Sequence, residues 1–327
     1  MVLRTLLNRL PLDRVPVPTA RWQRAITLAA VIGQATIAVT GAVVRVTGSG
    51  LGCPTWPQCA PGSLVPVAHP VTGQLHQWIE FGNRMLGGML GVVSALCVLM
   101  ALFARPRRRR VTVLALIMPL GVVAQAVIGG ITVRAGLQWW TVAPHFLASM
   151  PLVWAAVLLY RAVAEGDGPV RLLVPKPLVS LQAAQAVLLG LMLIAGTLVT
   201  AAGPHAGDQG TPRLAAPIVM LVQVHADLLC LFAGMLVALG FALRIAPVPA
   251  TLWHRYWTVV AVVLAQGMVG LVQYWTGVPA VLVLLHVLGA TVVVAASAAL
   301  WTASRDRGLV PVDADQTAAR TDQPAAV

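Results

Sequence analysis

Long apolar stretches separated by short polar connections dominate this chain. Eight of them are each long enough to cross a bilayer core of about 30 Å, which takes about 20 helical residues. Little sequence remains for a soluble domain. We therefore predict an all-α integral membrane protein with eight transmembrane helices, at residues 24–46, 77–103, 111–134, 139–163, 175–202, 217–244, 253–276 and 279–303.

The ends of the chain differ from its middle. Residues 1–20 and 304–327 are rich in Pro, Arg, Asp and Ala, so we expect flexible tails. Seven more apolar stretches follow 24–46, and no clean cleavage site does, so this segment is predicted to be a helix and not a removed signal peptide. We predict four parts: a tail at 1–20, a first half at 21–165, a second half at 166–303, and a disordered tail at 304–327.

Basic residues indicate the topology. A net charge of +12 would suit nucleic acid, but 18 of the 22 Lys and Arg residues lie on one side of the predicted helices. The positive-inside rule makes that side cytoplasmic and places both tails there. The connections 47–76 and 203–216 then lie outside, and no nucleic-acid partner is expected. The exceptions are Arg45, Arg84, Arg134 and Arg213.

The chain contains an internal repeat. Three residues of the first half recur 141 positions later: Gln125, Gly129 and His145 correspond to Gln266, Gly270 and His286. A shift of 142 places Asn83 over His225, and residues 40–44 weakly resemble residues 195–199. Both halves would enter the membrane from the cytoplasm. The repeat is therefore parallel, and we predict two related four-helix bundles.

Four equivalent positions of this repeat lie at one depth. They are about six to eight residues inside the outer ends of their helices, roughly 10 Å into the membrane: Asn83, His145, His225 and His286. Ionisable residues within a membrane are costly and usually functional, and paired imidazoles hold haem iron. We predict that His225 and His286 flank one haem, and that His145 faces Asn83. Alternatively, each histidine only hydrogen-bonds a neighbouring helix.

The four cysteines fall into two groups. Cys53 and Cys59 share the first outer connection, where a disulfide can form. A metal site is the alternative, although no second close pair completes it. Both a structural and a redox-responsive disulfide remain open. Cys97 and Cys230 lie within apolar helices and are predicted to be small buried hydrophobes.

Residues 40–59, TGAVVRVTGSGLGCPTWPQC, resemble the signature of the heme A synthase family. The resemblance extends to the Glu-x-x-x-Arg segment at 80–84 and to the histidines of later spans. It implies eight helices in two similar halves. It also implies oxidation of a ring methyl group of haem O to a formyl group, which gives haem A for cytochrome oxidase. The second half would hold haem b, and the first half would hold the substrate haem.

The resemblance assigns the histidines but leaves one ligand open. It makes His225 and His286 the haem b ligands and gives His145 a substrate-haem role. Many family members carry a histidine where this chain, like a bacterial, actinobacterial-like variant, has Asn83, a poor iron ligand. His145 therefore acts alone, or another group is the second ligand. His76 is one candidate, on the same helix face but about 10 Å nearer the outer surface.

Three charged residues are further candidates: Glu80, well within the membrane region, and Arg45 and Arg84, near the outer ends of helices. Glu80 suits proton transfer, and the resemblance makes it catalytic; alternatively it only pairs with Arg84 or Arg45. Arg45 and Arg84 are predicted to bind haem propionates, with snorkelling to the interface as the alternative. Asp227 has no role implied by the family and is expected to satisfy a polar neighbour.

We predict an enzyme of the bacterial plasma membrane. Its haem b would exchange electrons with the substrate haem, whose methyl group is hydroxylated in steps until the hydrate loses water. Expected partners are a haem O synthase, cytochrome oxidase assembly factors and membrane lipid. Two alternatives stay open: a b-type cytochrome that only relays electrons, and a proton-coupled transporter.

Overall fold

The computed structural model describes residues 16–67 and 73–308. Eight helices within this part are long and apolar enough to cross a membrane, which confirms the predicted class. The expected boundaries differ from the observed ones by at most four residues. The helices are α2 (Ala20–Val46), α3 (Gln74–Phe103), α4 (Arg109–Arg134), α5 (Trp139–Ala162), α6 (Lys176–Ala202), α7 (Ile218–Ile245), α8 (Ala250–Trp275) and α9 (Ala280–Ala303).

The largest boundary difference has a local cause. Helix α2 begins at Ala20, four residues before the expected start, because the Thr19 side chain accepts a hydrogen bond from the Trp22 main-chain N–H at 3.3 Å. Such a cap satisfies a donor that the first helical turn would otherwise leave unpaired. The polar residues before the apolar stretch are therefore helical and not part of a tail. Residues 1–15 lie outside the described part.

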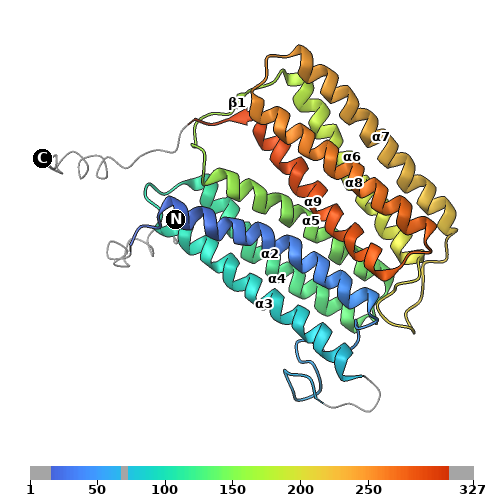
Figure 1. The fold of residues 1–327 in the computed structure, drawn as a ribbon. Coiled ribbons are helices and arrows are strands. Elements are labelled where there is room, and N and C mark those ends of the chain that lie inside the picture. The colour runs from blue at the N-terminus through green and yellow to red at the C-terminus, as the bar shows by residue number, and fades with distance from the viewer. Residues whose placement is uncertain (1–15, 68–72, 309–327) are drawn as a thin grey trace, which may run out of the picture.

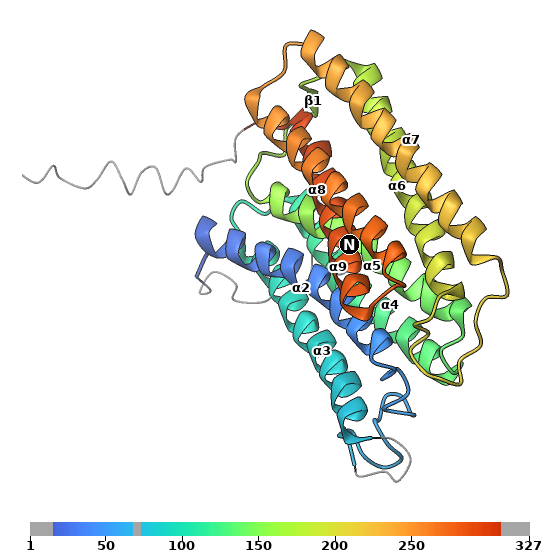
Figure 2. The same ribbon diagram turned by 45° about the vertical axis from the view of Figure 1, so that its right-hand side comes forward.

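The helices form two groups of four (Figures 1 and 2). Helices α2–α5 make the first half and α6–α9 the second, and α9 packs against both α2 and α5 between them. The connections after α2 and α6 lie at one end of the bundle, which we call the loop end (Figure 1). The α5–α6 connection and the end of α9 lie at the other, the linker end.

The two halves pack differently. In the first half all four neighbouring helix pairs pack closely, including α3 with α4 and α2 with α5. In the second half α6 packs on α7 and α8 on α9, but α7 touches α8, and α6 touches α9, at few positions. The second half is thus two helix pairs set apart.

Both buried cores lie away from the loop end. The first-half core joins Ala30, Met100, Met118 and Leu159, all toward the linker end of their helices. The second-half core likewise includes Leu239, Val259 and Leu300. Close packing therefore holds the linker-end part of each bundle, and the loop-end part contains mostly half-buried and exposed residues.

The linker end is fastened by polar contacts. Strand β1 (Arg171–Leu172) pairs antiparallel with β2 (Arg305–Asp306), which follows α9. The prediction of a disordered tail from residue 304 is therefore wrong for residues 304–308, because main-chain pairing with the linker holds them; residues 309–327 lie outside the described part. Arg108 and Arg110 also form ion pairs with Asp167 and Glu165 of the linker, at 2.9 and 2.5 Å.

At the loop end, Arg45 ties the halves together. Its Nε donates to the His205 carbonyl at 2.6 Å, and its Nη2 to the Thr200 carbonyl at 3.0 Å. The Gly50 N–H also donates to the Gly207 carbonyl at 2.9 Å. The first loop, which follows α2, is therefore hydrogen-bonded directly to the loop that follows α6 in the second half.

Candidate functional site

The most informative geometry joins His225 of α7 and His286 of α9. Their ring centroids are 6.3 Å apart, with ring planes at 64°. An imidazole nitrogen binds a metal at about 2.0–2.1 Å and lies about 1.2 Å from its ring centre, so two imidazoles on opposite sides of one metal have centres about 6.4 Å apart. The distance between the two rings therefore matches that expected of two ligands of one metal, across the gap between the helix pairs that stand apart.

The His225 ring is held in one orientation. Its Nδ1 lies 3.0 Å from the Met192 carbonyl, so Nδ1–H donates and Nε2 is left for a metal. The ring lies against Gly196, where an added Cβ would be 3.1 Å from the His225 Cε1. Gly270 lies equally close to His286, at 3.0 Å. Each ring therefore has its room because the residue beside it on the neighbouring helix is a glycine.

A glutamine of the preceding helix bonds to His145 and another to His286. Gln125 donates from Nε2 to the His145 carbonyl at 3.2 Å, and its Oε1 lies 3.1 Å from the His145 Nδ1. Gln266 donates to the His286 carbonyl at 2.8 Å. Its Oε1 and the His286 Nδ1 are both buried, and neither has a partner among the residues described. From the sequence these glutamines are recognised only as part of the repeat. Their recurrence together with the histidines is the signal that could have indicated contact between them.

In the first half, His145 of α5 and Asn83 of α3 are half-buried in the loop-end part of the bundle. Asn83 Oδ1 accepts a hydrogen bond from the Thr40 hydroxyl at 2.7 Å. His76 is placed elsewhere: its Nδ1 lies 2.9 Å from the Ser49 Oγ of the loop. No contact between His76 and His145 is recorded within the described ranges. The structure thus associates His76 with the loop and not with the histidine inside the bundle.

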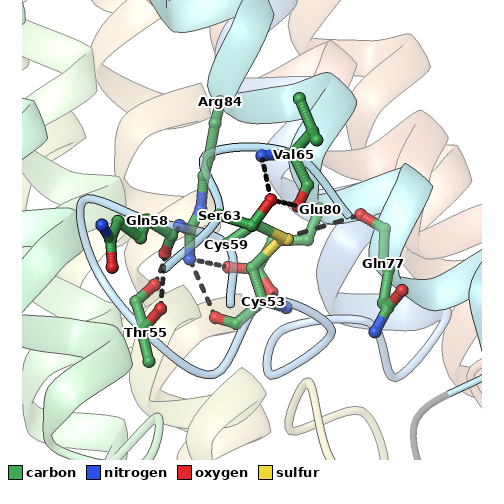
Figure 3. Close-up of a disulfide and its surroundings, with 9 residues drawn as sticks. All are labelled: Cys53, Thr55, Gln58, Cys59, Ser63, Val65, Gln77, Glu80 and Arg84. Atoms are coloured by element: carbon green, nitrogen blue, oxygen red, sulfur yellow. Dashed lines mark hydrogen bonds and ion pairs between the residues drawn. A yellow bond between two sulfur atoms is a disulfide. The ribbon is translucent and has the colours of Figure 1, made fainter. Parts of the chain in front are cut away.

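Glu80 connects α3 to the first loop (Figure 3). It is 5% exposed, and its Oε1 forms an ion pair with the Arg84 Nη2 at 2.6 Å. Its Oε2 accepts the Cys53 main-chain N–H at 2.7 Å. The predicted Glu80–Arg84 pair is therefore present, and both carboxylate oxygens are engaged.

Arg84 is the second connection to the same loop (Figure 3). Its guanidinium donates to the carbonyls of Cys53 at 2.9 Å, Thr55 at 2.9 Å and Gln58 at 3.1 Å. Arg45 likewise donates its hydrogen bonds to main-chain carbonyls. Propionate binding by either arginine stays a prediction.

The predicted disulfide is present, with Cys53 and Cys59 Sγ atoms 2.01 Å apart. No cluster of three or more His, Cys, Asp or Glu able to hold a metal ion occurs in residues 16–67 and 73–308. Cys97 is buried as expected, but the prediction for Cys230 is wrong, because it is exposed. With about 3.6 residues per turn, Cys230 lies on the far side of α7 from His225.

Asp227 bonds to a polar neighbour, as expected. It is exposed on α7, and its Oδ1 accepts a hydrogen bond from the Gln223 Nε2 at 2.7 Å. It lies two positions after His225 and therefore points away from the ring pair.

Fold and site together define a multi-pass membrane protein built from two four-helix groups, each with a half-buried histidine position near one end. The family described as cytochrome oxidase assembly protein (COX15-CtaA) matches residues 24–207, more than half of the chain. The chain belongs to this family. The match includes Glu80 and His145 and ends before α7.

Individual relatives are similar over shorter stretches. The heme A synthase of Lysinibacillus sphaericus is 32% identical over 148 residues, 45% of this chain and 47% of the relative. Those of Geobacillus kaustophilus and Shewanella oneidensis are 30% identical over 136 residues and 29% identical over 178. These alignments cover 41% and 49% of this chain, and 41% and 52% of the relatives. The chain thus spans about half the length of the relatives it matches.

Proposed function

We propose that this protein is a heme A synthase, a membrane haem-dependent oxidoreductase that converts haem O to haem A for cytochrome oxidase. The observation that carries the proposal is the 6.3 Å separation of the His225 and His286 rings in a member of this family. The separation suits two axial ligands of one haem b. The relatives are named heme A synthase, which supports haem A as the product, and the oxidation of haem O is what the resemblance of residues 40–59 implies.

In this proposal the second half (166–303) holds the resident cofactor. The haem b supplies one-electron transfer when bound. His225 would hold its iron through Nε2, because Nδ1 is engaged by the Met192 carbonyl. His286 would be the second residue to hold this haem, and Gln266 fixes the main chain that carries it. The close glycines keep both rings from being displaced by a neighbouring side chain.

The first half (21–165) holds the substrate haem. His145 is its ligand and is oriented by the Gln125 carboxamide, which accepts a hydrogen bond from Nδ1. Glu80 is the proposed proton acceptor during methyl oxidation. In its ion pair with Arg84 it is a carboxylate, which can take up a proton.

Topology in the membrane follows from the basic residues. The linker end, with its Arg-rich connections, is proposed to be cytoplasmic, and the loop with Cys53–Cys59 to lie outside the plasma membrane. A substrate that arrives through the membrane suits direct transfer from a haem O synthase, and the product would pass to cytochrome oxidase assembly partners.

Haem chromatography tests the proposal. The protein is co-expressed with a haem O source, purified, and its haems are extracted and separated. We expect haem A and haem b from the native chain, and haem b without haem A from Glu80→Gln. Absence of haem A from the native chain, with haem O available, would contradict the proposed reaction.

A relay cytochrome is the second candidate, because both oxygens of Glu80 are already engaged in holding the first loop. Such a protein needs the His225–His286 haem but no catalytic carboxylate. It would yield haem b alone in the same extract, and Glu80→Gln would change nothing but stability. A protein purified without any haem would favour a transporter over both.

A further inference from the structure

Each histidine of the repeat lies against a glycine of a neighbouring helix. An added Cβ would be 3.1 Å from the His225 ring at Gly196, 3.0 Å from the His286 ring at Gly270, and 3.3 Å from the His145 ring at Gly129. These contacts show how much room an imidazole takes beside such a glycine.

The fourth position of the repeat keeps the glycine but lacks the ring. Gly41 corresponds to Gly196, and Asn83 corresponds to His225. An added Cβ at Gly41 would meet nothing within 4 Å. The asparagine side chain is shorter than a histidine, and the Thr40 hydroxyl binds its Oδ1 at 2.7 Å. Room that the His225 ring takes beside Gly196 in the second half is therefore left open beside Gly41 in the first half.

The surroundings of this space define what could enter it. Asn83 Nδ2 has no hydrogen-bond partner in the described part of the chain, so an amide donor is left free on the side chain that bonds Thr40, the residue before Gly41. The nearest charge along the chain is Arg84, which is neutralised by Glu80 and engaged by loop carbonyls. A small neutral ligand therefore fits better than an anion.

We infer that the first half leaves one axial side of its haem open, and that a small neutral iron ligand, no larger than an imidazole, binds there with Asn83 as hydrogen-bond donor. The inference rests on the proposed function, since it needs a haem on His145. The second half offers no such position, because His225 and His286 occupy both sides of its iron.

Ligand titration of the purified, haem-loaded protein tests the inference. The reduced protein is titrated with carbon monoxide, and the oxidised protein with imidazole, while optical spectra are recorded. We expect only one of the two haems to respond to each ligand. His145→Ala should abolish the response, and His286→Ala should retain it while losing the low-spin haem b spectrum.

Two substitutions address the open space itself. Asn83→His should place an imidazole beside Gly41, so that carbon monoxide no longer binds and a second low-spin spectrum appears. Gly41→Leu should fill the space without removing Asn83 and weaken imidazole binding by about tenfold or more. Gly190→Leu is the matched control, since an added Cβ there also meets nothing within 4 Å. Its imidazole affinity should equal that of the native chain.

Asn83→Leu tests the hydrogen bond. It leaves the space open but removes the donor, so carbon monoxide should still bind, with its C–O stretching band shifted to higher frequency. An unchanged band would overturn the role of Asn83. If the native chain makes haem A but neither ligand binds, the open axial side is wrong and the proposed function stands. If ligands bind at the His145 haem but no haem A forms, the axial side is open and the proposed reaction fails.

Discussion

The two halves of this molecule share a sequence repeat but hold their loop ends differently. The first half packs all four helices closely, and its loop is fastened to α3 by Glu80 and Arg84 and closed on itself by a disulfide. The second half leaves its helix pairs apart, with two imidazoles facing each other across the gap. Under the proposed function, this difference would let one helix framework hold a resident cofactor in the second half and an exchangeable substrate in the first.

The largest expected difference between the two halves comes from replacing their histidines. His286→Ala should lose the low-spin haem b entirely, because one axial ligand of the pair disappears, whereas His145→Ala should leave that spectrum intact. Optical spectra of the two purified variants provide the measurement. Loss of haem b in His145→Ala would show that the halves do not bind haem independently.

Replacing Glu80 should remove contacts that attach the first loop to α3 and should destabilise the first half. Glu80→Ala leaves Arg84 without its carboxylate and the Cys53 N–H without its acceptor, and breaking such a buried pair costs about 3–5 kcal/mol. Asp227→Ala is the matched control in the second half, since that carboxylate is exposed and contacts only Gln223. Thermal unfolding in detergent should show a large shift for the first variant and almost none for the second.

Opening the disulfide should have a smaller effect on the same half. Cys59→Ser removes a short covalent loop, whose closure is worth about 2 kcal/mol. The native chain should become less stable on addition of reductant, and the variant should not respond. Cys230→Ser is the control: its thiol is exposed on α7, and its stability should match the native chain with and without reductant. Equal reductant sensitivity of native chain and Cys59→Ser would contradict a stabilising role of the bond.

The smallest predicted effect compares two equivalent glycines. Gly196→Ala places a methyl group 3.1 Å from the His225 ring and should weaken haem b binding by about tenfold, as for other changes next to a metal ligand. Gly41→Ala meets nothing within 4 Å and should leave haem content unchanged, with a gain in helix stability of up to about 1 kcal/mol. Haem titration of the two variants provides the measurement, and equal losses of affinity would contradict the open room beside Gly41.

The sequence was sufficient for features that depend on linear spacing. Apolar length located all eight helices, the repeat brought His225 and His286 together, and two nearby cysteines indicated the disulfide. These features need no knowledge of how helices rotate against one another.

Contacts that depend on helix rotation could not be predicted in this way. Whether Cys230 faces the bundle is decided by which side of α7 packs, and hydropathy is similar on both sides. The Arg45 contacts with Thr200 and His205 join residues far apart in the chain. The Glu80–Arg84 spacing allowed an ion pair, but its attachment to the Cys53 loop required the folded loop.

The pairing of β1 with β2 has a consequence for how the second half could be rebuilt. Arg171, just before α6, lies directly opposite Asp306, just after α9, so this four-helix unit begins and ends at one point. Units with adjacent ends tolerate circular permutation and insertion into other chains. The second half could therefore be produced as a movable module, with new ends placed in one of its connections and the old ones fused through a few residues.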